Sequence, residues 1–280
     1  MSGHVLPLQG SVDPWAGGEV TASARCVLAP NPSPWTLDGT NTWLLGQPDS
    51  GAVVIVDPGP DHPGHLAAVR DAAQERGGAA LILLTHGHHD HAEGAGRLAR
   101  EVGAPVRAWD PQHRLGDEGL ADGDVIDMGD WRIDVVGTPG HTSDSVCLVL
   151  PHDGSLLTGD TVLGRGTSLV AWPDGHLGDY LASLRRLRDR LGGSADGATS
   201  IDRLLPGHGP VLADPMGAID AYLDHRLARL AEVADVVARG VTEPAAIVAT
   251  VYADVPREVW PAAEMNVRAQ LEYLGHRQSR

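Results

Sequence analysis

The most informative segment of this chain is Thr85-His86-Gly87-His88-His89-Asp90-His91. It follows an apolar run, Ala79–Leu84, that reads as a buried strand. It precedes Ala92–Glu101, which has helical character despite its two glycines. Imidazoles and a carboxylate packed this closely at a strand-to-helix turn are typical of a metal site rather than of a solvated surface loop. The segment therefore predicts metal binding at the end of a strand.

The donor types and their spacing predict two metal ions. Nitrogen and oxygen donors suit zinc, with manganese and iron as the alternatives. His86 and His88 can converge on one ion, while Asp90 and His91 turn toward a second. His89, in the middle of the segment, is expected to face solvent. The segment is thus typical of a two-metal enzyme.

Three later segments each place a further donor just past the end of a strand. His141 follows a Pro-Gly turn, Asp160 follows the apolar run that ends at Gly159, and His208 follows Pro206 and a glycine. Glycine and proline let the backbone turn sharply, so that a short side chain can project inward from a sheet edge. Together with the first segment, these donors form a strong metal-site signal.

Composition limits the class of protein and its surroundings. The chain has 280 residues, is 42% hydrophobic, and contains no apolar run near the roughly 20 residues of a membrane span. Its first 25 residues lack the apolar segment of a secretory signal. Cys26 and Cys147 lie in apolar segments and are expected to be buried free thiols, which favours a cytoplasmic location. The net charge of −16 opposes binding of polyanions such as nucleic acid.

Short apolar strands alternate with glycine- and proline-rich turns from Val20 to Leu205. Helical periodicity appears between some of these strands, and the arginines of the last such helix are expected to form a solvated outer face. The predicted strands are Val53–Val56, Leu81–Leu84, Val106–Trp109, Trp131–Val136, Ser145–Leu150, Ser155–Thr158 and Arg203–Leu205, and the predicted helices are His62–Glu75, Ala92–Glu101 and Gly178–Leu191.

The composition changes after Asp214, where long helical patterns replace the short strands. We therefore expect a catalytic domain over residues 1–214 and a small helical domain over residues 215–280. The predicted helices of the second domain are Met216–Val237, Glu243–Tyr252 with Thr242 as its N-cap, and a third that runs from Pro256 to about Leu274.

The seven donors together resemble the metallo-β-lactamase superfamily, in which all seven positions occur in this order. The resemblance implies an α/β fold, a four-layered αββα sandwich with a dinuclear site along one sheet edge. It also implies the ligand sets: His86, His88 and His141 on the first metal, Asp90, His91 and His208 on the second, and Asp160 bridging the two.

A narrower resemblance to the β-lactamase-like protein 2 group covers most of the chain. It rests on Asn31–Leu44, Thr161–Thr167 and Tyr222–Arg226. It implies a C-terminal winged-helix-like domain and, from the animal members, an endoribonuclease activity on single-stranded RNA. Related fungal proteins act as thioesterases on carrier-bound polyketides. Ser33 and Trp35 depart from the opening motif of the group, and the C-terminal segment shows no pattern for a β-wing.

The resemblance implies a dinuclear zinc-dependent hydrolase, because two dications can bridge a water and lower its pKa to give a hydroxide nucleophile. Asp90 is expected to be the catalytic residue, since it can hydrogen-bond that hydroxide as well as bind metal. Asp57 either orients a ligand or simply forms the turn before Pro58-Gly59. The candidate substrate contacts are Thr167, Ser168 and His225, the last of which could instead pack between domains.

The substrate stays open between two classes. The resemblance favours single-stranded RNA, whereas the acidic charge and the C-terminal segment favour an acyl ester or thioester linked to CoA, a carrier protein or glutathione. A non-catalytic metal-stabilised scaffold is the alternative from another class, although such a scaffold would be expected to have lost ligands. A one-iron dioxygenase would need fewer of the second-site ligands. No membrane partner is expected, and the exposed helices are compatible with a homodimer.

Overall fold

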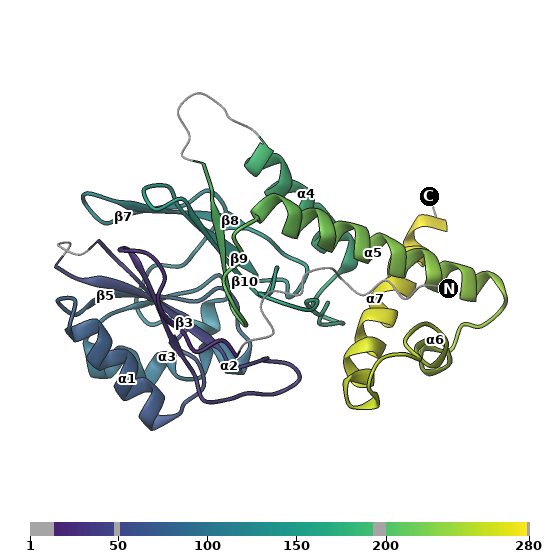
Figure 1. The fold of residues 1–280 in the computed structure, drawn as a ribbon, viewed down its shortest axis with the longest axis horizontal. Helices are drawn as coiled ribbons and strands as arrows, with labels where there is room; N and C mark the ends of the chain where they lie inside the picture. Colours follow the sequence, from purple (N-terminus) through teal and green to yellow (C-terminus); the bar gives the residue numbers. More distant parts are fainter. Residues whose placement is uncertain (1–13, 48–50, 193–199, 279–280) are drawn as a thin grey trace.

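A computed structural model describes residues 14–47, 51–192 and 200–278 of the protein. Two β-sheets pack face to face, and helices cover the outer face of each sheet (Figure 1). The first sheet has the order β1-β2-β3-β4-β5-β6, formed by β1 (Gly18–Glu19), β2 (Ala24–Leu28), β3 (Asn41–Leu45), β4 (Val53–Val56), β5 (Ala79–Leu83) and β6 (Val106–Arg107). The second has the order β11-β10-β9-β8-β7, formed by β7 (Val125–Asp127), β8 (Arg132–Gly137), β9 (Val146–Leu150), β10 (Ser155–Gly159) and β11 (Arg203–Pro206).

Most neighbouring strands are antiparallel, but three pairs are parallel. These pairs are β4–β5, β5–β6 and β10–β11. The connections that they require place helices outside the sheets. The helices are α1 (Pro63–Gln74), α2 (His89–Ala92), α3 (Ala95–Val102), α4 (Leu177–Gly192), α5 (Pro215–Ala238), α6 (Pro244–Val251) and α7 (Trp260–Gln278), with short 3₁₀ turns η1 (Pro111–His113) and η2 (Arg257–Val259).

The side chains of β3 point alternately to the two faces of the first sheet, so this strand contributes to two hydrophobic cores. Trp43 and Leu45 belong to the core between the sheets, which includes Ile133 of β8. Leu44 points to the opposite face and packs with Leu66 of α1 and other side chains of the outer core. Successive side chains of a strand point to opposite faces, so a strand that is covered on both sides must be apolar throughout. The predicted four-layered αββα sandwich is therefore confirmed.

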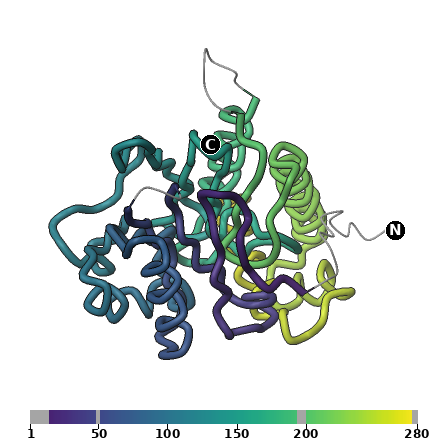
Figure 2. The backbone as a smooth tube through the Cα atoms, turned by 60° about the vertical axis from the view of Figure 1, so that its left-hand side comes forward, coloured from purple at the N-terminus to yellow at the C-terminus, as the bar shows by residue number. Residues whose placement is uncertain are grey.

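The C-terminal helices form a unit of their own at the end of α5. Ile219 and Tyr222, in the first half of α5, join the core beneath α4, whereas Val233 and Val236, in its second half, join a separate core with α6 and α7. Figures 1 and 2 show α6 and α7 on the side of the molecule opposite α1 and α3. Because α5 contributes to both cores, it ties the helical unit to the sandwich. The division between residues 214 and 215 stays a prediction.

Several expectations about element boundaries were wrong. The helix expected over Ala92–Glu101 is interrupted: α2 begins earlier, at His89, and α3 begins after Gly94. A Cβ on Gly94 would lie 3.0 Å from the carbonyl oxygen of Gly59, so the break coincides with a close backbone approach. Thr242 is not the cap of α6, because Glu243 is the N-cap and no side chain bonds there. Strand β6 ends at Arg107.

Other expectations from composition are borne out by the structure. Cys26 and Cys147 are buried and free, and burial raises the pKa of the Cys147 thiol to about 11. His89 is exposed. Among the described helices, none is long and apolar enough to cross a membrane.

Candidate metal centre

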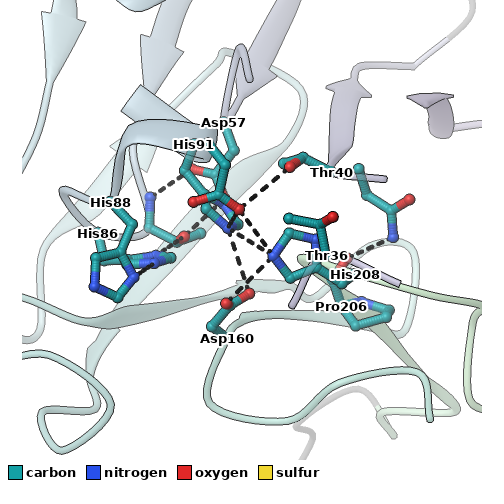
Figure 3. Close-up of polar contacts among 12 residues, drawn as sticks. Thr36, Thr40, Asp57, His86, His88, His91, Asp160, Pro206 and His208 are labelled. Carbon is teal, nitrogen blue, oxygen red and sulfur yellow. Dashed lines mark hydrogen bonds and ion pairs between the residues drawn. The ribbon is translucent and has the colours of Figure 1, made fainter. Parts of the chain in front are cut away.

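The seven predicted ligands gather where strands of both sheets end. The segment after β5 carries His86, His88, Asp90 and His91, and the remaining donors follow the other strands, His141 after β8, Asp160 after β10 and His208 after β11. Figure 3 shows five of these side chains, His86, His88, His91, Asp160 and His208, converging on one region. Two separate groups of donors could each hold a metal ion, and a third combination, His86, His91 and Asp160, shares one histidine with each of them.

Three imidazoles make up the first group. Nε2 of His86 lies 3.0 Å from Nδ1 of His88, and Nε2 of His141 lies 3.0 Å from the same atom. His86 and His141 are almost fully buried, whereas His88 is partly exposed. The three ring nitrogens thus converge on one another, as the ligands of a single ion must.

Asp90, His91 and His208 make up the second group. Nε2 of His208 lies 3.2 Å from Nε2 of His91 and 3.1 Å from Oδ2 of Asp90. Asp160 stands between the groups, with Oδ2 at 3.4 Å from His208 Nε2 and 3.7 Å from His141 Nε2. Its Oδ1 is buried without a hydrogen bond and lies 3.5 Å from His91 Nε2. This position suits a bridging carboxylate.

Acceptors behind the rings fix which nitrogen of each histidine faces the cluster. Nδ1 of His91 faces the Asp57 carboxylate at 2.9 Å, Nδ1 of His208 faces the Gly39 carbonyl at 3.1 Å, and Nδ1 of His141 faces the Leu169 carbonyl at 2.7 Å. Since these oxygens only accept, each Nδ1 must donate its proton. In the neutral rings the Nε2 lone pairs then point into the cluster. When both rings are neutral, the facing Nε2 atoms of His91 and His208 carry no proton, so a cation can bind between them.

Asp57 organises two of the rings. Its Oδ1 accepts from the backbone N–H of Thr85 at 2.8 Å, and its Oδ2 accepts from Thr85 Oγ1 at 2.7 Å as well as from His91. Because the Thr85 hydroxyl donates its proton to Asp57, its oxygen accepts a hydrogen bond from Nδ1 of His86 at 3.0 Å. Asp57 is 1% exposed and has a φ of 52°, a strained backbone conformation for a non-glycine residue. These contacts favour the ligand-orienting reading of Asp57 over that of a simple turn residue.

Charges in the second group favour bound cations. Burial alone would raise the pKa of Asp160, but His208 and His91 outweigh it and hold that pKa well below its usual range. Burial would likewise lower the pKa of His91, yet the Asp90 and Asp160 carboxylates raise it to about 9. The carboxylates therefore attract positive charge to this point, which a metal ion would supply.

In the first group the pKa values of the histidines are lowered rather than raised. Burial lowers the pKa of His141 to about 4, and burial together with the neighbouring His91 lowers the pKa of His86. These rings are therefore neutral near pH 7, which is the form that binds metal. The donor set, the tautomers and the charges fit two dications.

A cavity of about 710 Å³ opens beside the ligands. Thr167, Ser168 and His225 all line it, as does Asp90, whose side chain is 30% exposed. The far wall comes from the C-terminal helical unit. Its apolar members are Val255, Val259, Ala262, Ala263 and Met265, and its polar members are His225, Arg229, Tyr252 and Asn266. Substrate contact by Thr167, Ser168 and His225 stays a prediction. All three line the cavity, but Ser168 is only 2% exposed.

Sequence reasoning missed several groups that hold the site together. Thr85, directly before the first predicted ligand, could have been noticed as a hydroxyl at the strand end. The carbonyls of Gly39 and Leu169 act through the backbone and leave no side-chain signal. The apolar wall of the cavity is also absent from the predictions, because it depends on how α7 packs against the sandwich.

Comparison with known proteins finds a family match in the sandwich and another in the C-terminal helices. The metallo-beta-lactamase superfamily profile matches residues 35–196, and the beta-lactamase associated winged helix domain profile matches residues 244–278. A Drosophila melanogaster protein named "Beta-lactamase-like protein 2 homolog" is 32% identical over 91% of this chain and 88% of its own length. An Aspergillus terreus protein named "Atrochrysone carboxyl ACP thioesterase" is 31% identical over 78% of this chain and 64% of its own.

Solved structures agree in fold. A metallo-beta-lactamase family protein from Thermus thermophilus has a TM-score of 0.73 at 23% identity, over 91% of this chain and 94% of the other. A beta-lactamase domain protein from Burkholderia ambifaria has a TM-score of 0.76 at 22% identity, over 98% of this chain and 92% of the other. Both matches extend into the C-terminal helices.

Proposed function

This chain belongs to the metallo-beta-lactamase superfamily of metal-dependent hydrolases, and from that premise we propose that it holds two zinc ions and cleaves an ester or thioester of an apolar acyl group. His86, His88 and His141 would hold the first ion, Asp90, His91 and His208 the second, and Asp160 would contact both. When bound, such ions supply Lewis acidity and lower the pKa of a bound water.

Asp90 is proposed as the catalytic residue because it joins the ligand group to the cavity. Burial would raise its pKa, but His91 and His208 outweigh that effect and keep the pKa below its usual range. The carboxylate is therefore ionised near neutral pH and can accept a hydrogen bond from an attacking water. Thr40 Oγ1 donates a hydrogen bond to Asp90 Oδ2 at 3.4 Å and so orients the carboxylate.

The composition of the cavity wall is the observation that carries the choice of substrate. Side chains of the C-terminal unit give it a broad apolar surface, extended from the sandwich side by Trp35, Leu163 and Trp172. The guanidinium groups beside it are already engaged, Arg165 with Asp38 and Arg229 with Glu232. Such a wall suits a hydrocarbon group better than a phosphate backbone, which needs free arginine or lysine. The thioesterase named among the relatives is consistent with this choice.

Cleavage of single-stranded RNA is the second candidate. Its support is the match to relatives named "Beta-lactamase-like protein 2 homolog", which extends over 91% and 97% of this chain. The charge distribution weighs against it. On the arginine-rich face of α4, Arg186, Arg188 and Arg190 form ion pairs with aspartates, so the face presents little net positive charge.

Side-by-side assays of wild type and Asp90→Ala test the proposal. We expect the zinc-loaded wild type to hydrolyse acyl thioesters more efficiently as the acyl chain lengthens, and Asp90→Ala to lose several orders of magnitude in rate. Cleavage of single-stranded RNA by the wild type, lost in the same variant and without thioester turnover, would replace the acyl proposal with the second candidate.

A further inference from the structure

Arg226 of α5 connects the C-terminal helices to a loop beside the metal centre. The residue is 3% exposed. Its Nη1 donates to Asn266 Oδ1 of α7 at 3.0 Å, and its Nη2 donates to the carbonyl oxygen of Ser168. The guanidinium also lies over the Tyr180 ring of α4, 4.8 Å from its centroid. One side chain thus joins α4, α5, α7 and the loop after β10.

Asn266 anchors the same loop at a second point. Its Oδ1 also accepts a hydrogen bond from the backbone N–H of Val170 at 3.0 Å. Ser168 and Val170 are therefore both tied to the C-terminal helices, and Leu169 lies between them. The carbonyl oxygen of Leu169 is the acceptor for Nδ1 of His141.

The anchored loop also touches Asp160. The hydroxyl of Ser168 donates to the backbone carbonyl of Asp160, and the backbone N–H of Ala171 donates to the carbonyl of His141 at 2.9 Å. Two donors of the metal centre therefore depend on a loop whose position is set by Arg226 and Asn266.

We infer that Arg226 and Asn266 are positioning residues of the metal centre, which hold Leu169 so that His141 keeps Nδ1 protonated and presents Nε2 to the first ion. This inference rests on the proposed metal centre but not on its substrate. Groups that orient metal ligands typically change metal affinity or activity 10–100-fold when they are removed.

The cost of burying Arg226 argues that its contacts are specific. Among the described residues, no carboxylate forms an ion pair with Arg226, and its Nε is buried without a hydrogen bond. An apolar side chain would fill the space without that desolvation cost. An apolar side chain could not donate hydrogen bonds to both the Asn266 amide oxygen and the Ser168 carbonyl. The planar guanidinium of arginine can do so, because it carries several N–H donors in a fixed geometry.

Four variants of the full chain separate positioning from general packing. Asn266→Leu removes the shared acceptor at similar size, whereas Asn266→Asp keeps it and adds charge opposite Arg226. Arg226→Lys keeps the charge but loses the fork. Arg188→Met is the matched control, because Arg188 also joins α4 to α5, through Asp220, without reaching the loop.

The first readout is zinc affinity, measured by competition with a chromophoric chelator. We expect Asn266→Leu and Arg226→Lys to weaken binding of one zinc about 10–100-fold, and Asn266→Asp and Arg188→Met to stay within about threefold of wild type. The second readout is the ring ¹⁵N spectrum of the metal-free protein. There, His141 should be the Nδ1–H tautomer in wild type and Asn266→Asp, and a mixture of tautomers in Asn266→Leu.

Unchanged zinc affinity and an unchanged His141 tautomer in Asn266→Leu would overturn the inference. An equal loss in Arg188→Met would also overturn it, because helix docking in general would then explain the effect. If Asn266→Leu does not fold, Arg226→Lys compared with Asn266→Asp decides the question by the same two readouts. A wild type that binds no zinc would instead contradict the proposed centre itself.

Discussion

Replacing Asp57 by asparagine should damage the metal centre without touching a ligand. The carboxylate accepts three hydrogen bonds, two from Thr85 and one from His91 Nδ1. In Asp57→Asn one carboxylate oxygen is replaced by an NH₂ group. This group is itself a donor, and it faces the donors of Thr85 or His91. Where the NH₂ takes the Oδ2 position, His91 can answer by moving its proton to Nε2, which removes the lone pair that the second ion needs. The hydroxyl of Thr85 is also freed to donate to His86, so the first ion loses an oriented ligand as well.

The expected magnitude follows from the bonds that are lost. A hydrogen bond to a charged group contributes about 1.5–3 kcal/mol, and about 1.4 kcal/mol corresponds to a tenfold change in affinity. We therefore expect zinc affinity to fall between about tenfold and 100-fold in Asp57→Asn. Competition with a chelator measures this loss directly, before any activity assay.

Asp61→Asn is the matched control, because Asp61 follows β4 a few residues later but is exposed, and its carboxylate pairs with Arg97 rather than with any residue of the metal centre. We expect its zinc affinity to equal that of wild type. Wild-type affinity in Asp57→Asn would refute the tautomer reasoning, since it would show that the ring orientations do not depend on the carboxylate.

Three further predictions follow from the same structure. Chelation of zinc should lower the melting temperature, and added zinc should restore it, because ligand binding stabilises the folded state; an unchanged melting temperature would count against a bound metal. Val259→Glu should raise KM for a long-chain thioester about tenfold with kcat nearly unchanged, as the loss of roughly 1.5 kcal/mol of apolar contact implies; unchanged KM would place the acyl group elsewhere. Burial lowers the pKa of His65 from 6.5 to about 4, so the unfolded chain takes up the proton first. His65 should therefore reduce stability as the pH falls from about 6.5 to about 4, by up to about 3 kcal/mol, and urea unfolding of His65→Gln should show a weaker pH dependence than wild type.

The metal donors could be predicted because strand ends and turn residues are local signals. His141, Asp160 and His208 each follow an apolar run and a glycine or proline, and the structure places all three beside the first segment. The four-layered sandwich was implied by the resemblance to the metallo-β-lactamase superfamily, and the alternation of short apolar strands with helices agrees with it. Strands β1, β3 and β7 were not predicted, since β1 and β7 are very short and β3 lies in turn-rich sequence.

Features that depend on tertiary packing could not be predicted. The interruption of the helix at Gly94 depends on the approach of Gly59, more than thirty residues earlier in the chain. Arg226 belongs to a segment, Tyr222–Arg226, on which the resemblance rests, but its hydrogen bond to Asn266 depends on the docking of α7. The apolar wall of the cavity likewise arises where helices of the C-terminal unit meet the sandwich.

The number of zinc ions bound per chain tests the central claim most directly. Saturating zinc, removal of excess metal and elemental analysis should give two ions in the wild type and one in His208→Ala, which loses a ligand of the second group only. One ion or none in the wild type would contradict the two-metal centre on which the proposed hydrolysis depends.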